Sequence, residues 1–553
     1  MTSASNKDNA TKLTVLMLWL LLGVFVVYPL CRLFAMTFWV DGQFTFENLM
    51  PFIDNWYDRR SAVNSIVLGC CVGLAGTALG FVFAFVTTRM NLPTWLKLAV
   101  SAITILPLIS PPFTSSIALT LLLGPNGMVL QLLGLDNFNF YGFWGTFISE
   151  TLTFFPVAFM TISTILARID PNLEDAAYSL GASSSSVFRT VTLPLAAPGI
   201  ANAFLLVFSC SLADFATPQV LGGHSFPVLP TQAYLQITGM YDFKGGAALS
   251  FMLLIPALVV YAIQNYWVGK KSYVTVSGKA GGRSSIKGPG TLISAVMALV
   301  VVAVIAFIIA IYAVILVGSL VKVWGVNNTI TLDNYTYVLT FGIEAIKDTL
   351  IIACIATPLG GLLAVLVGYV TARLKVRGRK TLETISLLNY TLPGTVVGIA
   401  YIIAFNDKPL ILTGTLAILV AAYLFRYSSA GIRNVIAALT QIDPSIEEAS
   451  RSLGAGSART FVSITIPLVL PAVLSGMKYL FIHSMTAISA TIFLVSVNWT
   501  LITTRILECM TELQFAQACA FSVILILLVF AASATMTLLA KVLCRTGDHI
   551  GVK

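Results

Sequence analysis

The titratable residues that recur at a fixed spacing in this chain are carboxylates. An acidic pair follows the dipeptide Asp-Pro at two places that lie 273 residues apart: Glu174 with Asp175, and Glu447 with Glu448. Proline suits the first turn of a helix, and carboxylates there complement the positive end of the helix dipole. Both acidic pairs are therefore expected to open short polar helices.

Each acidic pair belongs to a longer polar stretch, at 169–200 and at 442–473, and the two stretches align without a gap. In each stretch a glycine, Gly181 or Gly454, is expected to give a sharp turn at the end of the first helix. A hydroxyl-rich run then starts a second short helix, and a proline leads into the next apolar run. A repeat at this distance far exceeds the roughly 20–50 residues of solenoid repeats, so we predict two fused copies of one domain.

The residue patterns argue against other chemistry. The three histidines lie far apart and no nucleophile–base pattern is visible, so no catalytic site is predicted. The eight cysteines are scattered without CxxC or Cys/His ligand spacing, which predicts neither disulfides nor a metal centre. The motif G-x-x-x-x-G-K-[ST] does not occur, so the chain is not expected to bind ATP by the usual phosphate loop. We therefore predict that the protein is not an enzyme and holds no cofactor.

Composition indicates the setting of these polar stretches. The chain is 57% hydrophobic and only 10% charged, which is typical of a polytopic membrane protein. A membrane-spanning helix needs about 20 apolar residues. In the first half we predict spans at 12–36, 61–88, 97–123, 141–167, 198–221 and 247–268, and in the second half at 291–321, 346–372, 383–405, 411–438, 471–496 and 516–541. Proline-containing runs at 105–113 and 388–398 are expected to kink their helices.

The predicted fold class is an all-α polytopic membrane protein with two homologous six-helix halves and about twelve transmembrane helices. The first half comprises residues 1–268 and the second half residues 291–553. Between them, the Gly-, Ser- and Lys-rich segment 269–290 is predicted to be a flexible linker on the cytoplasmic side.

Basic residues predict the orientation in the membrane. The segment 373–380, RLKVRGRK, and most other Lys and Arg residues fall in alternate connections, whereas the connection at 124–141 has none. The positive-inside rule therefore places both polar stretches and both termini in the cytoplasm. This rule also explains the net charge of +9, so no nucleic-acid partner is expected.

The two polar stretches resemble the EAA loop of binding-protein-dependent ABC importer permeases. The pattern of that loop is E-A-A, three residues, glycine, nine residues and then I-x-L-P. The first copy reads Asp-Ala-Ala at 175–177 and Val-Thr-Leu-Pro at 191–194, and the second reads Glu-Ala-Ser at 448–450 and Ile-Thr-Ile-Pro at 464–467. The departures from the pattern are therefore mild in both copies.

This resemblance implies a type I ABC importer transmembrane fold and a permease subunit that forms the translocation path by alternating access. Each loop would dock in a groove of a separate ATPase subunit, which binds the ATP and Mg. The residues that the resemblance assigns to this coupling are Glu174, Asp175, Ala176, Ala177, Gly181, Pro194, Glu447, Glu448, Ala449, Gly454 and Pro467. The alternatives are a solvated loop without a partner and glycines that only cap helices.

Partners and location follow from the same resemblance. It implies two ATP-binding cassette subunits on the cytoplasmic side of one chain, a periplasmic or lipid-anchored solute-binding protein, and a multi-pass position in the bacterial cytoplasmic (inner) membrane with its lipid. The projecting helices are expected to bury a small apolar face in the ATPase, formed by Leu180 and Phe188 in one copy and by Leu453 and Phe461 in the other. Their acidic residues are expected to meet basic groups there.

The substrate is predicted from weaker signatures. ADFATPQVLGG at 213–223 and ISATIFLVS at 488–496 are similar to segments of iron(III)-type permeases, which implies ferric iron transport. Transport of a phosphonate or a sugar phosphate is the alternative within this subfamily. A different class, an ion-coupled secondary carrier, also has twelve spans and two related halves. The repeated functional residues of such a carrier, however, are expected inside the membrane, whereas the repeated polar stretches of this chain are expected in cytoplasmic loops.

Three residues within predicted spans are candidates for the translocation path. Asp214 is the most informative, because a carboxylate inside a membrane is costly unless it faces a cavity or a partner. Its counterpart in the second half is Ala487. The alternative is that Asp214 caps a helix near the membrane interface. Lys478 and His483 could serve an anionic substrate, although a lysine near the end of a span also reaches the headgroups.

Overall fold

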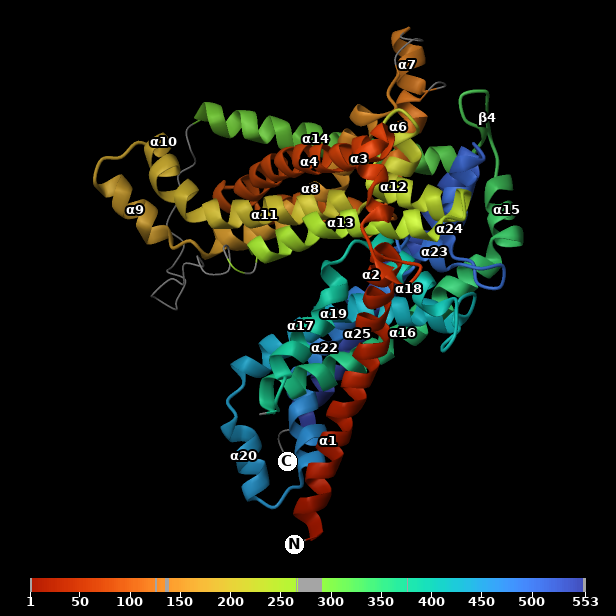
Figure 1. Cartoon of the computed structure of the whole chain (residues 1–553). Helices are drawn as coiled ribbons and strands as arrows, with labels where there is room; N and C mark the ends of the chain where they lie inside the picture. The colour runs from red at the N-terminus through yellow and green to blue at the C-terminus, as the bar shows by residue number, and fades with distance from the viewer. Residues whose placement is uncertain are drawn as a thin grey trace.

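The computed structural model describes residues 2–124, 127–134, 139–264, 266, 291–374 and 376–550. The predicted linker at 269–290 lies outside the described residues. The described chain is built of helices with two short β-hairpins, β1–β2 and β3–β4. Figure 1 shows two helical bundles that diverge toward the ends marked by α9–α10 and by α20.

The first part of the chain forms α1 to α13. Their bounds, with the first hairpin, are α1 Thr2–Leu22, α2 Tyr28–Phe38, β1 Trp39–Val40, β2 Gln43–Phe44, α3 Pro51–Asp54, α4 Trp56–Arg89, α5 Thr94–Ile109, α6 Phe113–Leu123, α7 Met128–Leu133, α8 Phe143–Arg168, α9 Pro171–Ser179, α10 Ser184–Val187, α11 Leu193–Ala213, α12 Leu229–Tyr234 and α13 Phe243–Ile263. A π-helical segment, Gly23–Val27, joins α1 to α2, so the two form one long helix.

The second part repeats this order. Its elements are α14 Thr291–Ser319, β3 Val321–Val323, β4 Asn327–Ile330, α15 Asp333–Phe341, α16 Ile343–Arg373, α17 Arg379–Thr391, α18 Gly394–Phe405, α19 Leu416–Gln441, α20 Ser445–Ser452, α21 Ser457–Thr460, α22 Ile466–Thr486, α23 Thr491–Leu494, α24 Ile502–Thr511 and α25 Phe515–Ile550. The helices α4, α8 and α11 thus correspond to α16, α19 and α22. The order of the elements is thus the same in both parts, as the duplication predicted from the sequence requires.

Within the described residues, ten helices are long and apolar enough to cross a membrane, or eleven if the bent pair α17–α18 counts as one span. With α19 added, each of the twelve predicted spans has a helix or a helix pair at its position, so the prediction of about twelve is confirmed. The expected span at 97–123 is broken at Ser110–Pro112 into α5 and α6. Alone, α5 has 16 residues and reaches about 24 Å, less than the ~30 Å of a hydrocarbon core. The expected span at 411–438 is present as α19 but is not among the ten, and it carries Arg426 and Arg433.

Both proline-containing runs bend the chain, as predicted. In the second half α17 and α18 meet at 109°, and in the first half α5 ends before Pro111 and Pro112. Because a proline cannot donate the usual helical hydrogen bond, each break releases backbone groups that the surrounding helices must satisfy.

Three helices form the centre of each half, and they cross at small residues. In the first half α4 packs on α8 and α11, and a Cβ added at Gly80 would overlap Ala158. In the second half α16 packs on α19 and α22, and a Cβ added at Gly476 would overlap the backbone of Gly431. Small side chains let helix backbones approach closely, so these crossings fix the three helices of each half against one another.

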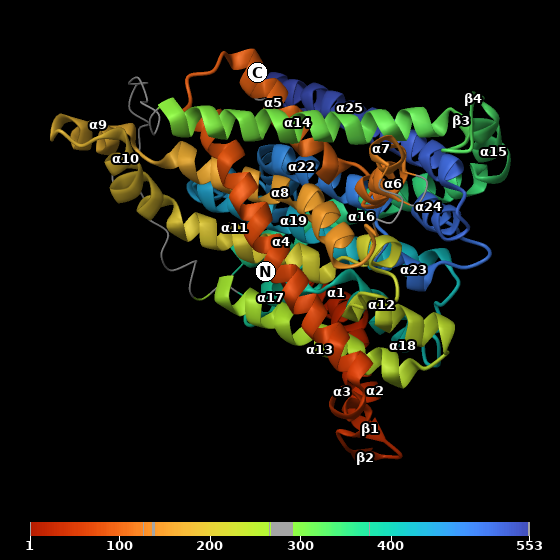
Figure 2. The ribbon, with the colours of Figure 1, turned by 90° about the horizontal axis from the view of Figure 1, so that it is seen from above.

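The first long helix of each half packs against the other half. Tyr401 of α18 donates a hydrogen bond to the carbonyl of Phe25, 2.7 Å away, and Phe25 stacks on Phe425 of α19. Likewise, the first helix of the second half contacts the first half: Tyr312 of α14 forms a hydrogen bond with Ser110, which follows α5. Figure 1 shows α1 running along the second bundle and α14 lying along the first, and Figure 2 shows α14 crossing above α4. The halves defined by sequence, 1–268 and 291–553, therefore exchange their first helices.

Candidate functional site: two projecting loops and a buried polar pocket

The two EAA-like stretches form projecting helix–turn–helix loops with matching geometry. Asp170 accepts a hydrogen bond from the backbone N–H of Asn172 at 3.0 Å, and Asp443 accepts one from that of Ser445 at 2.9 Å. Each aspartate thus satisfies a free N–H at the start of a helix, α9 or α20. The Ser445 N–H also lowers the pKa of the exposed Asp443, so this cap stays charged at neutral pH.

Glycine makes the turn in both loops, as the sequence predicts. Gly181 has φ +85° and Gly454 has φ +86°, a left-handed conformation that residues with a side chain rarely adopt. The N–H of Ala182 closes the first turn on the carbonyl of Ala177, and the N–H of Ala455 closes the second in the same way. These turns direct α10 and α21 back toward the membrane-spanning helices.

A leucine lies at the tip of each loop and is almost fully exposed. Leu180 is 88% exposed and Leu453 is 89% exposed. Each precedes its turn glycine, so its side chain stands where α9 or α20 ends. The same apolar side chain thus stands at the tip of both loops, and no other described part of the chain covers it. Such a side chain is suited to enter a groove of another protein.

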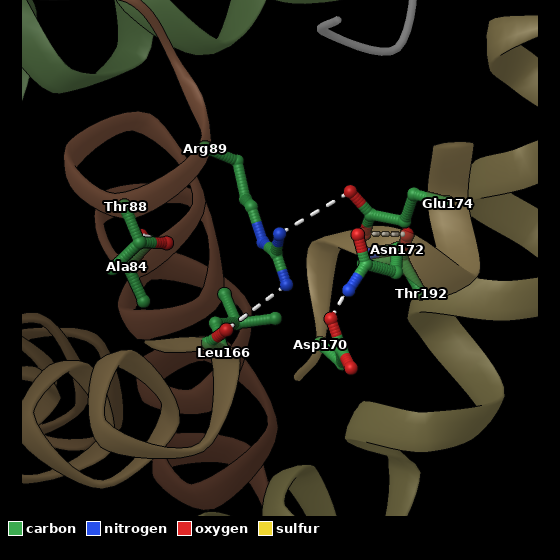
Figure 3. A network of polar contacts seen from close by, with 8 residues as sticks. All are labelled: Ala84, Thr88, Arg89, Leu166, Asp170, Asn172, Glu174 and Thr192. Atoms are coloured by element: carbon green, nitrogen blue, oxygen red, sulfur yellow. Dashed lines mark hydrogen bonds and ion pairs between the residues drawn. The ribbon is translucent and has the colours of Figure 1, made fainter. Parts of the chain in front are cut away.

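Glu174 is not directed at a partner, contrary to the expectation from the sequence. Its Oε2 lies 3.2 Å from Nη1 of Arg89, and its Oε1 accepts a hydrogen bond from Thr192 at 2.8 Å. Arg89 also donates to the carbonyl of Leu166 at 3.0 Å, as Figure 3 shows. Burial of an unpaired carboxylate is costly, and Arg89, at the end of α4, supplies the opposite charge from within the chain.

The second loop repeats this contact. Nε of Arg373 lies 3.2 Å from Oε1 of Glu447, Thr465 donates to the same oxygen at 3.2 Å, and Arg373 donates to the carbonyl of Ile442. A second arginine, the half-exposed Arg451, approaches Glu447 Oε2 at 3.7 Å. The expectation that Glu447 meets basic groups of a partner is therefore also wrong. Each buried glutamate instead fastens its loop to the end of α4 or α16.

The remaining predicted coupling residues lie on the outside of the loops or at the start of the next helix. Asp175 is half-buried and Glu448 is exposed, so these two acids remain available to a partner. The other members of this set are Ala176, Ala177, Ala449, Pro194 and Pro467, of which only Ala177 is not exposed. Pro194 and Pro467 occupy the first turns of α11 and α22.

Phe188 and Phe461 do not form part of an exposed apolar face. Phe188 packs edge-on against Phe85 of α4, with ring centroids 5.5 Å apart. Phe461 packs against Tyr369 of α16 at 4.8 Å. Both rings turn toward their own bundle because the helices α10 and α21 lie against the spans. The exposed apolar side chains of the loops are instead Leu173 and Leu180 in the first loop and Ile446, Leu453 and Val462 in the second, with the two tip leucines the most exposed.

Asp214 is buried at the end of α11, with 6% of its surface exposed. Its Oδ1 accepts a hydrogen bond from the N–H of Ala216, whereas its Oδ2 has no partner. The side chain of Asp214 thus bonds to the backbone that follows α11, and its role in the translocation path stays a prediction.

Lys478 and His483 lie on α22, and neither forms a hydrogen bond or an ion pair with Asp214 among the described residues. Lys478 donates to Thr537 of α25 at 3.0 Å. His483 stacks on Tyr479, with ring centroids 3.8 Å apart. The structure thus does not gather the three path candidates into one site.

Glu150 is a buried acid that the sequence interpretation missed. It lies within α8, is 0% exposed, and accepts a hydrogen bond from the hydroxyl of Ser211. Ser211 belongs to the last turn of α11, where its carbonyl accepts the N–H of Asp214. Ser211 therefore links Glu150 and Asp214 in one buried polar cluster, called the polar pocket below. A carboxylate in the apolar run FWGTFISETLTFF was the available signal.

Among the described residues, no group of three or more His, Cys, Asp or Glu side chains is arranged to hold a metal ion. The polar pocket of Glu150 and Asp214 therefore offers two carboxylates and the hydroxyl group of Ser211, without a third described residue of these four types placed to join them.

Residues 76–272 and 360–545 match the model of one family, described as "Binding-protein-dependent transport system inner membrane component". The ferric transport system permease protein FbpB of Actinobacillus pleuropneumoniae is 37% identical over 93% of this chain and 76% of its own length. A putative ferric transport system permease protein, FbpB 1 of Haemophilus influenzae, is 38% identical over 88% of this chain and 78% of its own length.

The solved structure of a bacterial ABC transporter involved in the import of the acidic polysaccharide alginate has 18% sequence identity to this chain and a TM-score of 0.42, and the match covers 49% of this chain and 99% of that chain.

Proposed function

The chain belongs to the family of binding-protein-dependent transport system inner membrane components, and we propose that it is the permease of a ferric iron importer. The family accounts for both halves of the chain, so the two related bundles together form the transmembrane part of an ABC importer. This membership argues against the ion-coupled secondary carrier as an alternative.

Ferric iron is proposed as the substrate because relatives of 37% and 38% identity, aligned over most of this chain, are ferric transport permeases by name. Phosphonate or sugar phosphate transport has no comparable support, and the uptake experiment described below distinguishes it from ferric iron transport. Selection of the ion would rest mainly with an external solute-binding protein.

We propose further that each projecting loop docks on one ATPase subunit. The observation that carries this proposal is the pair of exposed leucines, Leu180 and Leu453, at equivalent tips. The loops would transmit force because Glu174 and Glu447 fasten them to α4 and α16. One chain would then serve two ATPase subunits, which carry the ATP and Mg, in the bacterial cytoplasmic membrane with both termini on the ATPase side.

Reconstitution tests this function directly. The chain is assembled in lipid vesicles with its ATPase and solute-binding subunits, and uptake of radioactive ferric ion delivered by the binding protein is followed with and without ATP. We expect uptake only with ATP, and a mass of the complex that fits one permease and two ATPase chains. Uptake of a phosphonate or a sugar phosphate in place of ferric ion would overturn the substrate. A proton gradient that drives uptake without ATP would overturn the function.

A further inference from the structure

We propose that the buried carboxylates of Glu150 and Asp214 form a transient cation site in the translocation path, at which the ferric ion is passed across the membrane. The inference rests on the proposed ferric transport, and it adds the residues that contact the ion.

Both carboxylates keep a free oxygen in the interior. Oε1 of Glu150 and Oδ2 of Asp214 are buried and have no hydrogen-bond partner, and neither residue takes part in an ion pair found among the described residues. Buried polar atoms are nearly always paired, so a cluster of unpaired oxygens in one pocket indicates a missing ligand.

The pocket lies where the two halves meet. Phe215 and Ala216, which directly follow Asp214, belong to one buried cluster with Phe481, Met485 and Ile488 of the second half. Asp214 is also at the end of α11 that is remote from the α9–α10 loop. A cation bound here would thus be held between the bundles, at the far side from the proposed ATPase contacts.

The site is present in the first half alone. The counterpart of Glu150 is Tyr423, whose hydroxyl is satisfied by Thr491 at 2.6 Å. The counterpart of Asp214 is Ala487. A structural role common to both halves would keep equivalent polar groups in both. The difference instead favours a role that the complex needs once, such as contact with a single substrate ion.

Electrostatics favours a cation at this place. Two ionised carboxylates side by side in apolar surroundings repel each other and lack solvation, so the pocket requires a proton or a cation. Carboxylate and hydroxyl oxygens suit hard cations. With two carboxylates and not a complete ligand set, the site would bind the ion weakly enough to release it, as passage through a membrane requires.

Neutral isosteric variants test the role of the charges. In the complete reconstituted complex, Glu150→Gln and Asp214→Asn are compared with Asp58→Asn, a control at a buried carboxylate of the same half whose Oδ2 is already paired with Asn55 at 3.0 Å. We expect the first two variants to lower ferric ion uptake by about tenfold or more. They should keep the stimulation of ATP hydrolysis by the iron-loaded binding protein, because the loops are unchanged. The control should transport like the wild type.

A chemical readout on the wild type avoids any effect of substitution on folding. Dicyclohexylcarbodiimide modifies protonated carboxyl groups in apolar sites, and mass spectrometry locates the product. We expect labelling at Glu150 or Asp214 in the vanadate-trapped complex with iron-free binding protein, and protection when the binding protein carries iron. Equal labelling in both states, with unchanged uptake by Glu150→Gln, would identify a purely structural pair and overturn the inference. If the wild type transports no ferric ion, the proposed function itself fails, and this site fails with it.

Discussion

Arg89 and Glu174 form an ion pair at 3.2 Å between the end of α4 and the first helix of the projecting loop, and their side chains are only 4% and 9% exposed. Arg373 and Glu447 repeat it at the same distance in the second half. The pair connects a 34-residue helix, α4, to the projecting loop, which also contacts this helix through Phe188 and Phe85. A force on the loop is therefore carried into the spans through a buried contact.

Removal of the arginine should loosen the first loop more than the second. Arg89→Gln leaves the carboxylate of Glu174 buried without its counter-charge, which typically costs about 3–5 kcal/mol. Arg373→Gln should cost less, since Glu447 keeps Arg451 at 3.7 Å. The rate of tryptic cleavage at the exposed Arg189 and Arg459 measures the opening of each loop. The double variant Arg89→Gln with Glu174→Gln should recover part of the loss, and equal cleavage of the single and double variants would contradict the role of the pair.

Substitution of the tip leucines should affect partner binding and leave the fold intact. Leu180→Ser and Leu453→Ser alter side chains that are almost fully exposed, so stability should change by less than about 0.5 kcal/mol. Affinity for the ATPase should fall by about tenfold or more if each leucine fills a groove. Co-purification with the ATPase and thermal unfolding separate the two effects. Leu332→Ser, at an exposed leucine before α15, is the control, and weaker ATPase binding by that variant would point to a nonspecific effect.

The effect of a substitution at either turn glycine should depend on how readily the new residue adopts a left-handed backbone conformation, and not on the size of its side chain. A Cβ at Gly181 or Gly454 would meet nothing within 4 Å, but the left-handed backbone costs an ordinary residue roughly 1–2 kcal/mol. Gly454→Asn should therefore retain more uptake than Gly454→Ala, because asparagine adopts this conformation more readily. Gly454→Glu should lose coupling before it loses insertion into the membrane. Uptake and ATPase assembly are measured in parallel, and normal uptake by Gly454→Glu would argue against docking of this loop.

The close crossing of α19 and α22 should not accept even one methyl group. Gly476→Ala would place a Cβ against the backbone of Gly431, and overpacking of this kind costs about 1–3 kcal/mol. The thermal unfolding temperature of the detergent-solubilised protein should fall. Gly456→Ala provides the matched control, since its added Cβ would meet nothing within 4 Å. An unchanged unfolding temperature for Gly476→Ala would show that the two helices separate easily.

Much of the fold could be predicted because its signals are local or repeated. Long apolar runs indicated most spans, prolines indicated the breaks beside Pro111 and Pro393, and the copied stretches indicated equivalent loops. The exchange of α1 and α14 between the halves could not be predicted, since it depends on packing between distant segments. A kink within 97–123 was predicted, but not its division into two separate helices, α5 and α6, because an apolar run gives no measure of direction after a proline.

The sites were predicted less completely, for a related reason. Arg89 and Arg373 are the next-to-last residues of the matching segments AFVTTRM and GYVTARL. The sequence interpretation explained their positive charge by membrane topology alone. Their pairing with Glu174 and Glu447 was therefore not predicted. Whether an acidic residue of a short helix faces inward depends on the helix that covers it. Glu150 likewise needed the neighbouring turn of α11 to reveal its importance.

Fusion of the two halves into one polypeptide permits an asymmetry that a homodimer cannot have. In an assembly of two identical chains, any side chain beside the twofold axis occurs twice, and an acidic residue there would confront its own copy. Here Asp214 faces a second half with alanine at the corresponding position, 487. Because the two halves are parts of one chain, their sequences can differ at matching positions, so one half carries a charge that the other lacks while both loops keep the same geometry.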